Sequence, residues 1–217
     1  MLTSDPAVLI LASRSPRRRE LLERFIGSGR LQIMVPDYDE SAVSQGNTNP
    51  RELVCLLASG KLDALHNQFQ LPDTYAALAA DTMVVLDDQA LGKPIDLADA
   101  VRMLRLLSGK THQVITGISL DTCCEGKTFS LQTAEVTDVR FARLDEQQIE
   151  WYASTGEPFD KAGAYGIQGF GAALVRQIDG CYYNVMGLPV NRLMDMLQTA
   201  ADHFSSNTSF AHLLPWT

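Results

Sequence analysis

The sequence predicts an α/β protein with some antiparallel strand pairing. Two observations lead to this prediction. Several apolar runs have the length of a strand, and they alternate along the chain with segments whose apolar residues recur at helical spacing. A third observation is size, because 217 residues suffice for one large domain or two small lobes around a buried core. We find no internal repeat, so a repeat architecture is not expected.

The first elements follow from turn and cap residues. Residues 7–12 form a short apolar run, which is typical of a buried strand. The Ser-Pro pair at residues 15–16 suits the N-cap and first position of a helix, which the glycine-containing segment 27–29 ends. Residues 31–35 are predicted to form a second strand, which runs into the acidic loop 37–40.

The middle of the chain continues the alternation. Pro50 opens a second helix, and we expect Gly60 to interrupt that helix just before Lys61. Residues 75–86 have the pattern of a strand, which is predicted to break at the polar pair Asp81-Thr82. Residues 97–107 have apolar side chains at helical spacing and predict a helix that ends at Ser-Gly.

The last third of the chain is predicted to hold a strand pair, two helices and a glycine-rich segment. The expected elements are strands 113–120 and 132–141 joined through residues 123–128, a capped helix 145–154, a glycine-rich stretch 163–171, a strand 172–178 and a helix from Leu188 to about Leu197. We expect residues 1–204 to form one catalytic domain of two lobes, and residues 205–217 to form a tail.

Composition and charge exclude several classes of protein. The formal net charge of −8, with no basic tail, argues against a nucleic-acid binder. No apolar run approaches the roughly 20 residues of a membrane span. The N-terminus lacks a basic segment followed by an apolar core, so we do not expect a signal peptide. The four cysteines lack metal-ligand spacing, which indicates reduced thiols. We therefore expect a cytoplasmic protein without membrane or nucleic-acid partners.

The start of the first helix is a candidate phosphate site. A helix N-terminus presents free N–H groups and a partial positive charge. Here it follows Ser13 and carries Arg17 and Arg18, whose forked donors fit phosphate oxygens. The alternative is a capped helix with solvated arginines.

Acidic residues supply a second candidate feature. Asp81 lies in a strand whose two faces are both apolar, where an ionised carboxylate is costly unless it is paired or binds a metal. The loop 37–40 ends on Glu40, and carboxylate oxygens suit Mg²⁺. The alternatives are an aspartate that caps a turn and a solvated acidic loop.

Loop cations and a glycine-rich segment complete the set of candidates. Lys61, Lys93 and Lys161 lie in loops or near helix ends, where solvated surface lysines are the alternative. Gln168 lies in the glycine-rich stretch and offers the donor and acceptor that reading a nucleobase edge requires, unless that stretch is a plain hairpin. His112 is interpreted as a structural histidine at a strand start.

Six segments carry a resemblance that covers residues 8–197. They are LASRSPRRRELL, DYDES, AADTMVVLDDQALGKP, LSGKTHQVITGISL, EPFDKAGAYGIQGFGA and YYNVMGLPV. In their order and spacing the chain resembles the Maf family of nucleotide pyrophosphatases, also called septum formation inhibitors. The resemblance implies hydrolysis of nucleoside triphosphates to monophosphate and pyrophosphate with Mg²⁺ or Mn²⁺. It further implies a mixed twisted sheet flanked by helices in two lobes with a central cleft, and a possible homodimer.

The resemblance also implies roles for individual residues. Asp81 is the catalytic proton acceptor, and Glu40 and Asp81 are the expected metal ligands. Substrate-binding residues are implied at Ser13, Arg17, Arg18, Lys61, Thr82, Lys93, Lys161 and Gln168. Of these, Arg17, Thr82 and Gln168 match the Arg, Thr and Gln of the subfamily that acts on dTTP and UTP. The subfamily that prefers 7-methyl-GTP carries Trp, Gln and Glu there.

Three other functions are compatible with the same residues. A non-catalytic nucleotide-binding regulator of cell division would bind nucleotides and release no pyrophosphate. A phosphatase would remove the γ-phosphate and give a diphosphate. A 7-methyl-GTP pyrophosphatase would also release pyrophosphate from a nucleoside triphosphate, but it would act on a different nucleobase. The product and the preferred nucleotide distinguish these functions.

Overall fold

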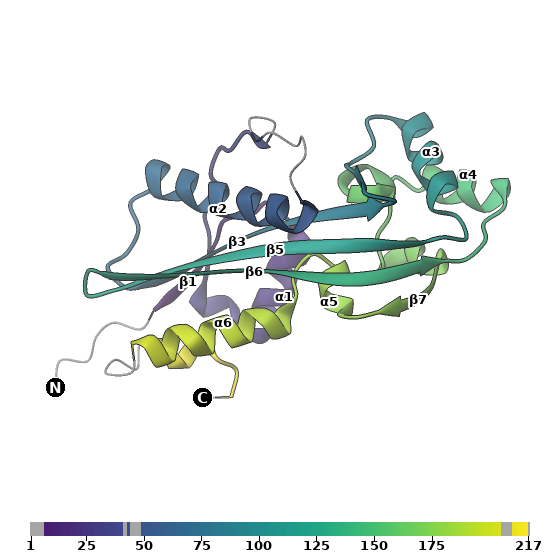
Figure 1. The fold of residues 1–217 in the computed structure, drawn as a ribbon. Helices are drawn as coiled ribbons and strands as arrows, with labels where there is room; N and C mark the ends of the chain where they lie inside the picture. The colour runs from purple at the N-terminus through teal and green to yellow at the C-terminus, as the bar shows by residue number, and fades with distance from the viewer. Residues whose placement is uncertain (1–6, 41–42, 44–48, 205–209, 217) are drawn as a thin grey trace. The chain divides into compact units, whose positions relative to one another are not determined.

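A mixed sheet forms the framework of the protein. The computed structural model describes residues 7–40, 43, 49–204 and 210–216. Seven strands have the order β2-β1-β3-β5-β6-β7, with the short β4 paired to β3 (Figure 1). Strand β1 is parallel to both β2 and β3, whereas β4 and β7 pair antiparallel with β3 and β6. The strands are β1 Val8–Leu11, β2 Leu31–Ile33, β3 Tyr75–Leu86, β4 Gln89–Leu91, β5 Thr111–Cys124, β6 Lys127–Phe141 and β7 Val175–Asp179. The predicted α/β class with a mixed sheet is confirmed.

The helices begin at the cap residues that the sequence marks. Ser15 caps α1, Asn49 caps α2, Asp96 caps α3 and Asp145 caps α4, each by accepting a backbone N–H of the first turn. The helices are α1 Pro16–Phe25, α2 Pro50–Gln68, α3 Leu97–Leu107, α4 Glu146–Ser154, α5 Tyr182–Val185 and α6 Val190–His203.

Three local expectations are wrong. Strand β3 is not broken at Asp81-Thr82, because ladder pairing with β1 over its first residues and with β4 over its last keeps it extended. Helix α2 is not interrupted at Gly60, because four apolar side chains of the flanking turns are buried (Leu57, Ala58, Leu62 and Leu65). The last strand begins at Val175 and not at residue 172, because residues 169–173 form a 3₁₀ turn.

The hairpin of β5 and β6 is longer than expected. Its strands reach Cys124 and Lys127, so only Glu125 and Gly126 form the connection. Both residues have positive φ, at 52° and 76°. Such two-residue turns match the twist of the flanking strands and allow the ladder to continue to the turn.

The chain divides into two compact units. Unit 1 comprises residues 1–81, 117–134 and 190–217, and unit 2 comprises residues 82–116 and 135–189. Strands β3, β5 and β6 each contribute residues to both units. The cleft implied by the family resemblance stays a prediction, as does the single catalytic domain over residues 1–204.

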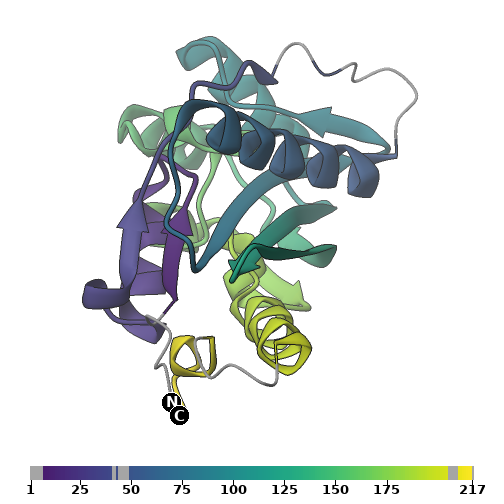
Figure 2. The ribbon, with the colours of Figure 1, turned by 90° about the vertical axis from the view of Figure 1, so that its left-hand side faces the viewer.

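In unit 1, helix α2 covers one face of the strands and α6 the other (Figures 1 and 2). Gly117 of β5 allows α2 to approach closely, since a Cβ atom there would lie 2.5 Å from the carbonyl carbon of Val54. Gln132 of β6 donates a hydrogen bond of 2.8 Å to the carbonyl of Cys55. These contacts fix the helix that carries Lys61. Beneath it lies a cluster of buried apolar residues, namely Ile10, Ala12, Leu62, Leu65, Tyr75, Ala77 and Ala79.

The end of the chain adds a small apolar contact to unit 1. Residues 205–209 and 217 of the predicted tail lie outside the described residues. Phe210, Leu213 and Leu214 are buried, and Phe210 stacks on Phe204 at the end of α6 with ring centroids 5.1 Å apart. His212 lies 2.9 Å from the carbonyl of Ala7. Residues 210–214 therefore pack within unit 1, against the residue after α6 and the residue before β1.

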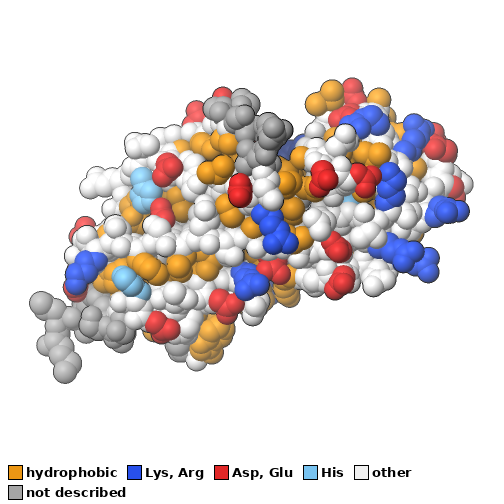
Figure 3. All heavy atoms as spheres, viewed as in Figure 1, with side chains coloured by type: hydrophobic (Ala, Val, Ile, Leu, Met, Phe, Trp, Pro, Cys, Tyr) orange, Lys and Arg blue, Asp and Glu red, His pale blue; other side chains and the backbone are white. Residues whose placement is uncertain are grey.

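The surface and the cysteines give further context. Acidic and basic side chains are interspersed on the face drawn in Figure 3. No helix within the described ranges is long and apolar enough to cross a membrane. The four cysteines are free thiols, as predicted.

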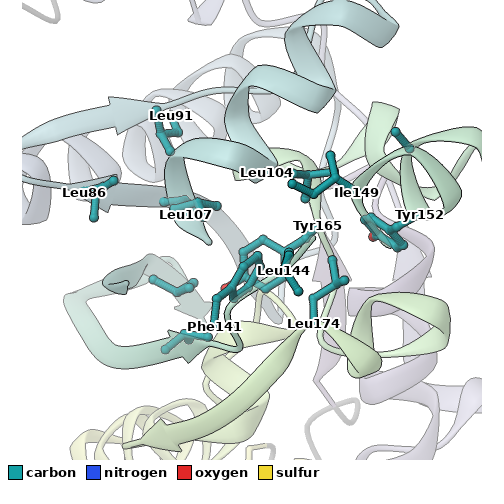
Figure 4. Packing of buried hydrophobic residues seen from close by; sticks show 14 residues of the cluster. Leu86, Leu91, Leu104, Leu107, Phe141, Leu144, Ile149, Tyr152, Tyr165 and Leu174 are labelled. Atoms are coloured by element: carbon teal, nitrogen blue, oxygen red, sulfur yellow. The ribbon is translucent and has the colours of Figure 1, made fainter. Parts of the chain in front are cut away.

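Unit 2 has its own apolar core, drawn in Figure 4. His112, at the second position of β5, is 2% exposed and lies beside this core. Its Nε2 is 2.7 Å from the Tyr165 hydroxyl, and its ring meets Phe141 edge-on at 5.1 Å. The predicted structural role of His112 is confirmed. The core cluster consists of Val84, Leu86, Leu91, Leu104, Leu107, Val114, Val139, Phe141, Leu144, Ile149, Tyr152, Ala153, Tyr165 and Leu174.

Mild acid is expected to destabilise the protein through His112. Burial lowers the pKa of His112 from 6.5 to about 4. Between these values the unfolded chain binds a proton that the folded chain excludes, so stability falls as the pH falls through this window. We expect a loss of about 2 kcal/mol in the free energy of unfolding between pH 7 and pH 5.

Urea unfolding at the two pH values measures this effect. A His112→Phe variant retains an aromatic ring and lacks the titrating group, so its loss should be smaller by that amount. Equal losses in the variant and the wild type would contradict the assignment.

Candidate active site

The loop between β1 and α1 presents a helix start that suits an anion. Pro16 occupies the first position of α1, and the Ser15 hydroxyl accepts the Arg18 backbone N–H at 3.4 Å. The first turn contains no acidic residue that would compete for an anion. Ser13 is half-buried, and its Oγ accepts the Ser15 N–H at 3.2 Å. The start of a helix carries partial positive charge, and this is the type of position at which proteins bind phosphate.

Arg18 joins this helix start to strand β3. Its guanidinium is buried, and Nη1 donates to the Ala80 carbonyl at 2.9 Å and to the Ser13 hydroxyl at 3.2 Å. Burial lowers the pKa of Arg18, and the nearby Asp81 carboxylate acts in the opposite direction. Since Ala80 precedes Asp81, these hydrogen bonds fix the strand at the residue before the predicted catalytic acid.

Lys61 connects the two predicted metal ligands. Its Nζ lies 2.5 Å from Asp81 Oδ1 and 2.8 Å from Glu40 Oε1. The Lys61 and Asp81 side chains are 13% and 14% exposed, whereas that of Glu40 is 55% exposed. The largely buried Lys61 ammonium group therefore contacts both carboxylates, and that of Glu40 remains exposed to water.

Tyr38 lies in the loop that carries Glu40. Burial raises the pKa of Tyr38, and the charges of Glu40 and Asp63 raise it further. The phenol is therefore neutral at neutral pH. Residues 37–40 run along α2, where Gln68 holds the backbone of Asp37 by two hydrogen bonds of 2.8 and 2.7 Å.

Unit 2 holds four of the predicted substrate-binding residues. The Thr82 hydroxyl is 2.9 Å from that of Thr116, which itself donates to the Asn184 carbonyl at 3.2 Å. Because Thr116 uses its proton on Asn184, Thr82 is the donor between the two threonines. Thr82 is thereby tied to β5 and α5.

The loops of Lys93 and Lys161 are joined by one backbone hydrogen bond. The N–H of Gly163 donates to the carbonyl of Gly92 at 3.0 Å. Gly163 has a φ of 66°, and a Cβ atom there would lie 2.9 Å from Val84. Lys93 is exposed, whereas the Lys161 ammonium contacts the Glu157 carbonyl and the Asp160 carboxylate, both at 2.6 Å.

Glu157 holds the loop that follows Gln168. Its carboxylate accepts the N–H of Phe170 at 3.0 Å and the N–H of Gly171 at 3.3 Å. Gly169, between Gln168 and these donors, has a φ of 66°. The Gln168 side chain is exposed next to this fixed turn.

The structure thus distributes the predicted site residues over two groups. Unit 1 brings together Ser13, Arg18, Glu40, Lys61 and Asp81, with the half-buried Arg17 on the same helix turn as Arg18. Unit 2 contains Thr82, Lys93, Lys161 and Gln168. Three residues that contact these groups or their loops are not among the predicted site residues, namely Tyr38, Gln68 and Glu157.

The carboxylates of unit 1 raise the question of whether they fit a divalent metal ion. Among the residues that the structure describes, no group of three or more His, Cys, Asp and Glu side chains could hold a metal ion. Glu40 and Asp81 instead form a pair of carboxylates that already converge on a cation, the Lys61 ammonium. Mg²⁺ commonly takes one or two carboxylates together with substrate phosphates, so this pair fits such an ion.

Together, the fold and this group define an α/β protein in which a capped, arginine-bearing helix start lies beside a pair of converging acids. The chain belongs to the family of Maf-like proteins, whose family model matches residues 8–200. The predicted family is confirmed.

Three relatives with known names are close in sequence. The dTTP/UTP pyrophosphatase of Symbiobacterium thermophilum is 51% identical over 189 residues, which cover 87% of this chain and 92% of the relative. The dTTP/UTP pyrophosphatase of Clostridioides difficile is 46% identical, over 92% of this chain and 96% of the relative. That of Clostridium botulinum strain 657 is 43% identical, over 87% and 95%.

A solved structure gives a more distant match. It is that of a HAM1 protein from Coxiella burnetii, which is 17% identical with a TM-score of 0.45 and covers 78% of this chain and 80% of the other.

Proposed function

We propose that the chain is a nucleoside triphosphate pyrophosphatase that hydrolyses dTTP and UTP to the nucleoside monophosphate and pyrophosphate. Relatives that are 43–51% identical over at least 87% of this chain bear that name and support the predicted enzyme class. The observation that carries the proposal is the position of Asp81. Its carboxylate is held by Lys61 on the strand that Arg18 ties to the anion-binding helix start.

Asp81 is the base in the proposed reaction. Lys61 engages Oδ1, so we assign Oδ2 to the attacking water. As the water oxygen forms a bond to the α-phosphorus, a proton passes to Asp81, and the bond from the α-phosphorus to the bridging oxygen of the β-phosphate breaks. Pyrophosphate leaves with that oxygen and the electron pair of the broken bond.

Cationic and N–H groups of unit 1 bind the charged part of the substrate. Phosphate oxygens are proposed to lie at the start of α1, where the helix end carries partial positive charge. The Ser13 hydroxyl, whose oxygen already accepts two hydrogen bonds, donates its proton to a phosphate oxygen. Arg17 on the first turn adds positive charge. Arg18 donates hydrogen bonds from Nη1 to the Ala80 carbonyl and the Ser13 hydroxyl. It therefore orders both the start of α1 and strand β3, which carries Asp81.

A divalent cation would be held by Glu40 and Asp81. When bound, such an ion supplies Lewis-acid polarisation of phosphate oxygens and neutralises part of their charge. Lys61 contacts the same two carboxylates and therefore limits their mutual repulsion when no ion lies between them.

The residues of unit 2 remain assigned by resemblance. Lys93 and Lys161 are proposed to bind substrate, and their loops are joined through Gly92 and Gly163. Thr82 and Gln168, with Arg17 of unit 1, are proposed to select a pyrimidine base, since all three match the dTTP/UTP subfamily.

A panel of nucleoside triphosphates with Mg²⁺ or Mn²⁺ tests the proposed function. We expect pyrophosphate and monophosphate from dTTP and UTP, at higher kcat/KM than from purine nucleotides. Orthophosphate and diphosphate would indicate a γ-phosphatase, and binding without any product would indicate a regulator. A preference for 7-methyl-GTP would contradict the proposed substrate and retain the proposed chemistry.

A further inference from the structure

The loop that carries Glu40 is attached to helix α2 at two separate points. The first point is Gln68, at the end of the helix. Its side-chain oxygen accepts the Asp37 N–H at 2.8 Å, and its side-chain nitrogen donates to the Asp37 carbonyl at 2.7 Å. This reciprocal pair of hydrogen bonds fixes the position of the loop at its first residue.

The second point is Gly60, two turns nearer the start of α2. A Cβ atom at Gly60 would meet the outer end of the Tyr38 side chain: the hydroxyl oxygen would be its nearest neighbour, and Cζ and a second ring carbon would lie 2.5 Å and 2.8 Å away. The Tyr38 ring therefore occupies the space that any other residue at position 60 would fill. Because Gly60 has no side chain, it leaves a gap on the surface of α2, and the Tyr38 side chain lies in this gap.

The dimensions of the loop and the helix match. Residues 61 and 68 are seven positions apart, so they lie on the same face of α2 at a separation of about 10 Å. Residues 37 and 40 are three positions apart, and an extended chain of that length also spans about 10 Å. With Asp37 fixed at Gln68, the loop is therefore long enough for Glu40 to reach Lys61, and Tyr38 between them determines its path.

The ion pair with Lys61 does not by itself hold Glu40 in place. The Glu40 side chain is 55% exposed, and exposed ion pairs contribute little to stability. The Glu40 carbonyl also accepts the Val43 N–H at 3.3 Å. The attachments at Gln68 and Gly60 act on residues 37 and 38, directly before Glu40.

We infer that Tyr38, Gly60 and Gln68 are positioning residues, which place the Glu40 carboxylate on the Lys61–Asp81 pair. This inference rests on the proposed function, in which Glu40 and Asp81 act together. Gly60 is required because the ring of Tyr38 needs the space beside it, even though glycine weakens a helix interior.

The Gly60→Ala variant tests the inference, because stability and activity should change in opposite directions. Alanine favours the helix, so the thermal midpoint should stay the same or rise. The new methyl group displaces the Tyr38 ring, and we expect the loop that carries Glu40 to shift with it. Since a displacement of about 1 Å at a catalytic group can cost about 100-fold in rate, we expect kcat/KM for dTTP to fall by about 100-fold. Ser59→Ala, which also replaces a weaker helix former by alanine on the neighbouring residue, is the control and should retain wild-type activity.

Double variants show whether the loss acts through the proposed contacts. In a Tyr38→Ala background, Gly60→Ala should cause no further loss, because the ring it displaces is gone. In a Glu40→Gln background it should also cause no further loss, because the carboxylate it misplaces is gone. Tyr38→Phe keeps the ring and should retain more activity than Tyr38→Ala. Independent losses in both backgrounds would overturn the inference, as would full activity of Gly60→Ala.

A crystal structure of Gly60→Ala separates this inference from the proposed function. We expect the distance from Lys61 Nζ to the Glu40 carboxylate to exceed the 4 Å limit of an ion pair, whatever the activity of the protein. An unchanged distance would overturn the inference even if the wild type releases pyrophosphate. Absence of pyrophosphate from the wild type would instead overturn the proposed function.

Discussion

Replacement of Asp81 by asparagine is expected to lower the rate of pyrophosphate release by about 10³-fold or more while the fold is retained. Asparagine has nearly the same shape as aspartate and cannot accept a proton from water at neutral pH. General-base catalysis contributes about 10²–10⁴-fold to enzymatic rates, and loss of a charge next to the substrate adds to that. The side-chain oxygen of asparagine can still accept the hydrogen bond that Lys61 donates to Oδ1 at 2.5 Å.

Steady-state release of pyrophosphate from dTTP, together with thermal unfolding, measures this effect. Asp121→Asn is the matched control, because Asp121 is also an aspartate of unit 1 with a side-chain partner, His66, whose Nε2 is 3.0 Å from its Oδ2. The control should keep wild-type turnover. A rate for Asp81→Asn within tenfold of the wild type would remove Asp81 from the chemistry.

Replacement of Lys61 by methionine is expected to have the second largest effect. Methionine fills similar space but leaves the Asp81 and Glu40 carboxylates without the ammonium that contacts both. We expect kcat/KM to fall by about 10²-fold, because two uncompensated carboxylates repel a triphosphate and each other. The free energy of unfolding should fall by up to about 3 kcal/mol, since Asp81 is only 14% exposed and loses its partner.

Kinetics with dTTP and urea unfolding measure the two losses separately. Lys127→Met removes a lysine from the β5–β6 turn and controls for the change in net charge. Lys61→Arg keeps the charge and should recover part of the stability, although its planar fork differs from the compact ammonium. Wild-type activity of Lys61→Met would show that the bridge between the carboxylates is not part of the active site.

Much of the fold could be predicted because local signals determine it. The Ser15-Pro16 pair starts α1 where expected, and the apolar spacing of residues 97–107 gives the bounds of α3 without error. Strand β3 was predicted to break at Asp81 because a polar pair usually marks a strand end. The ladders that keep it extended are formed with β1 and β4, and a sequence pattern does not reveal pairing partners.

The sequence indicates which residues belong to the candidate site, but it does not reveal which of them contact one another. A capped helix start with arginines and an acid in an apolar strand both have a physical reason that can be read locally. The bridge of Lys61 between Glu40 and Asp81 joins residues 20 or more positions apart, so it depends on tertiary structure. Gly60 gave a signal that was misinterpreted: a glycine inside a helix indicated a break, whereas it provides space for Tyr38.

Hydrolysis of dTTP in ¹⁸O-labelled water tests the proposed site of attack most directly. If Asp81 activates a water that attacks the α-phosphorus, mass spectrometry should find the label in dTMP and none in pyrophosphate, and Asp81→Asn should form both products more slowly by about 10³-fold or more. Label in pyrophosphate would place the attack on the β-phosphorus. Formation of dTDP and orthophosphate would contradict cleavage between the α- and β-phosphates altogether.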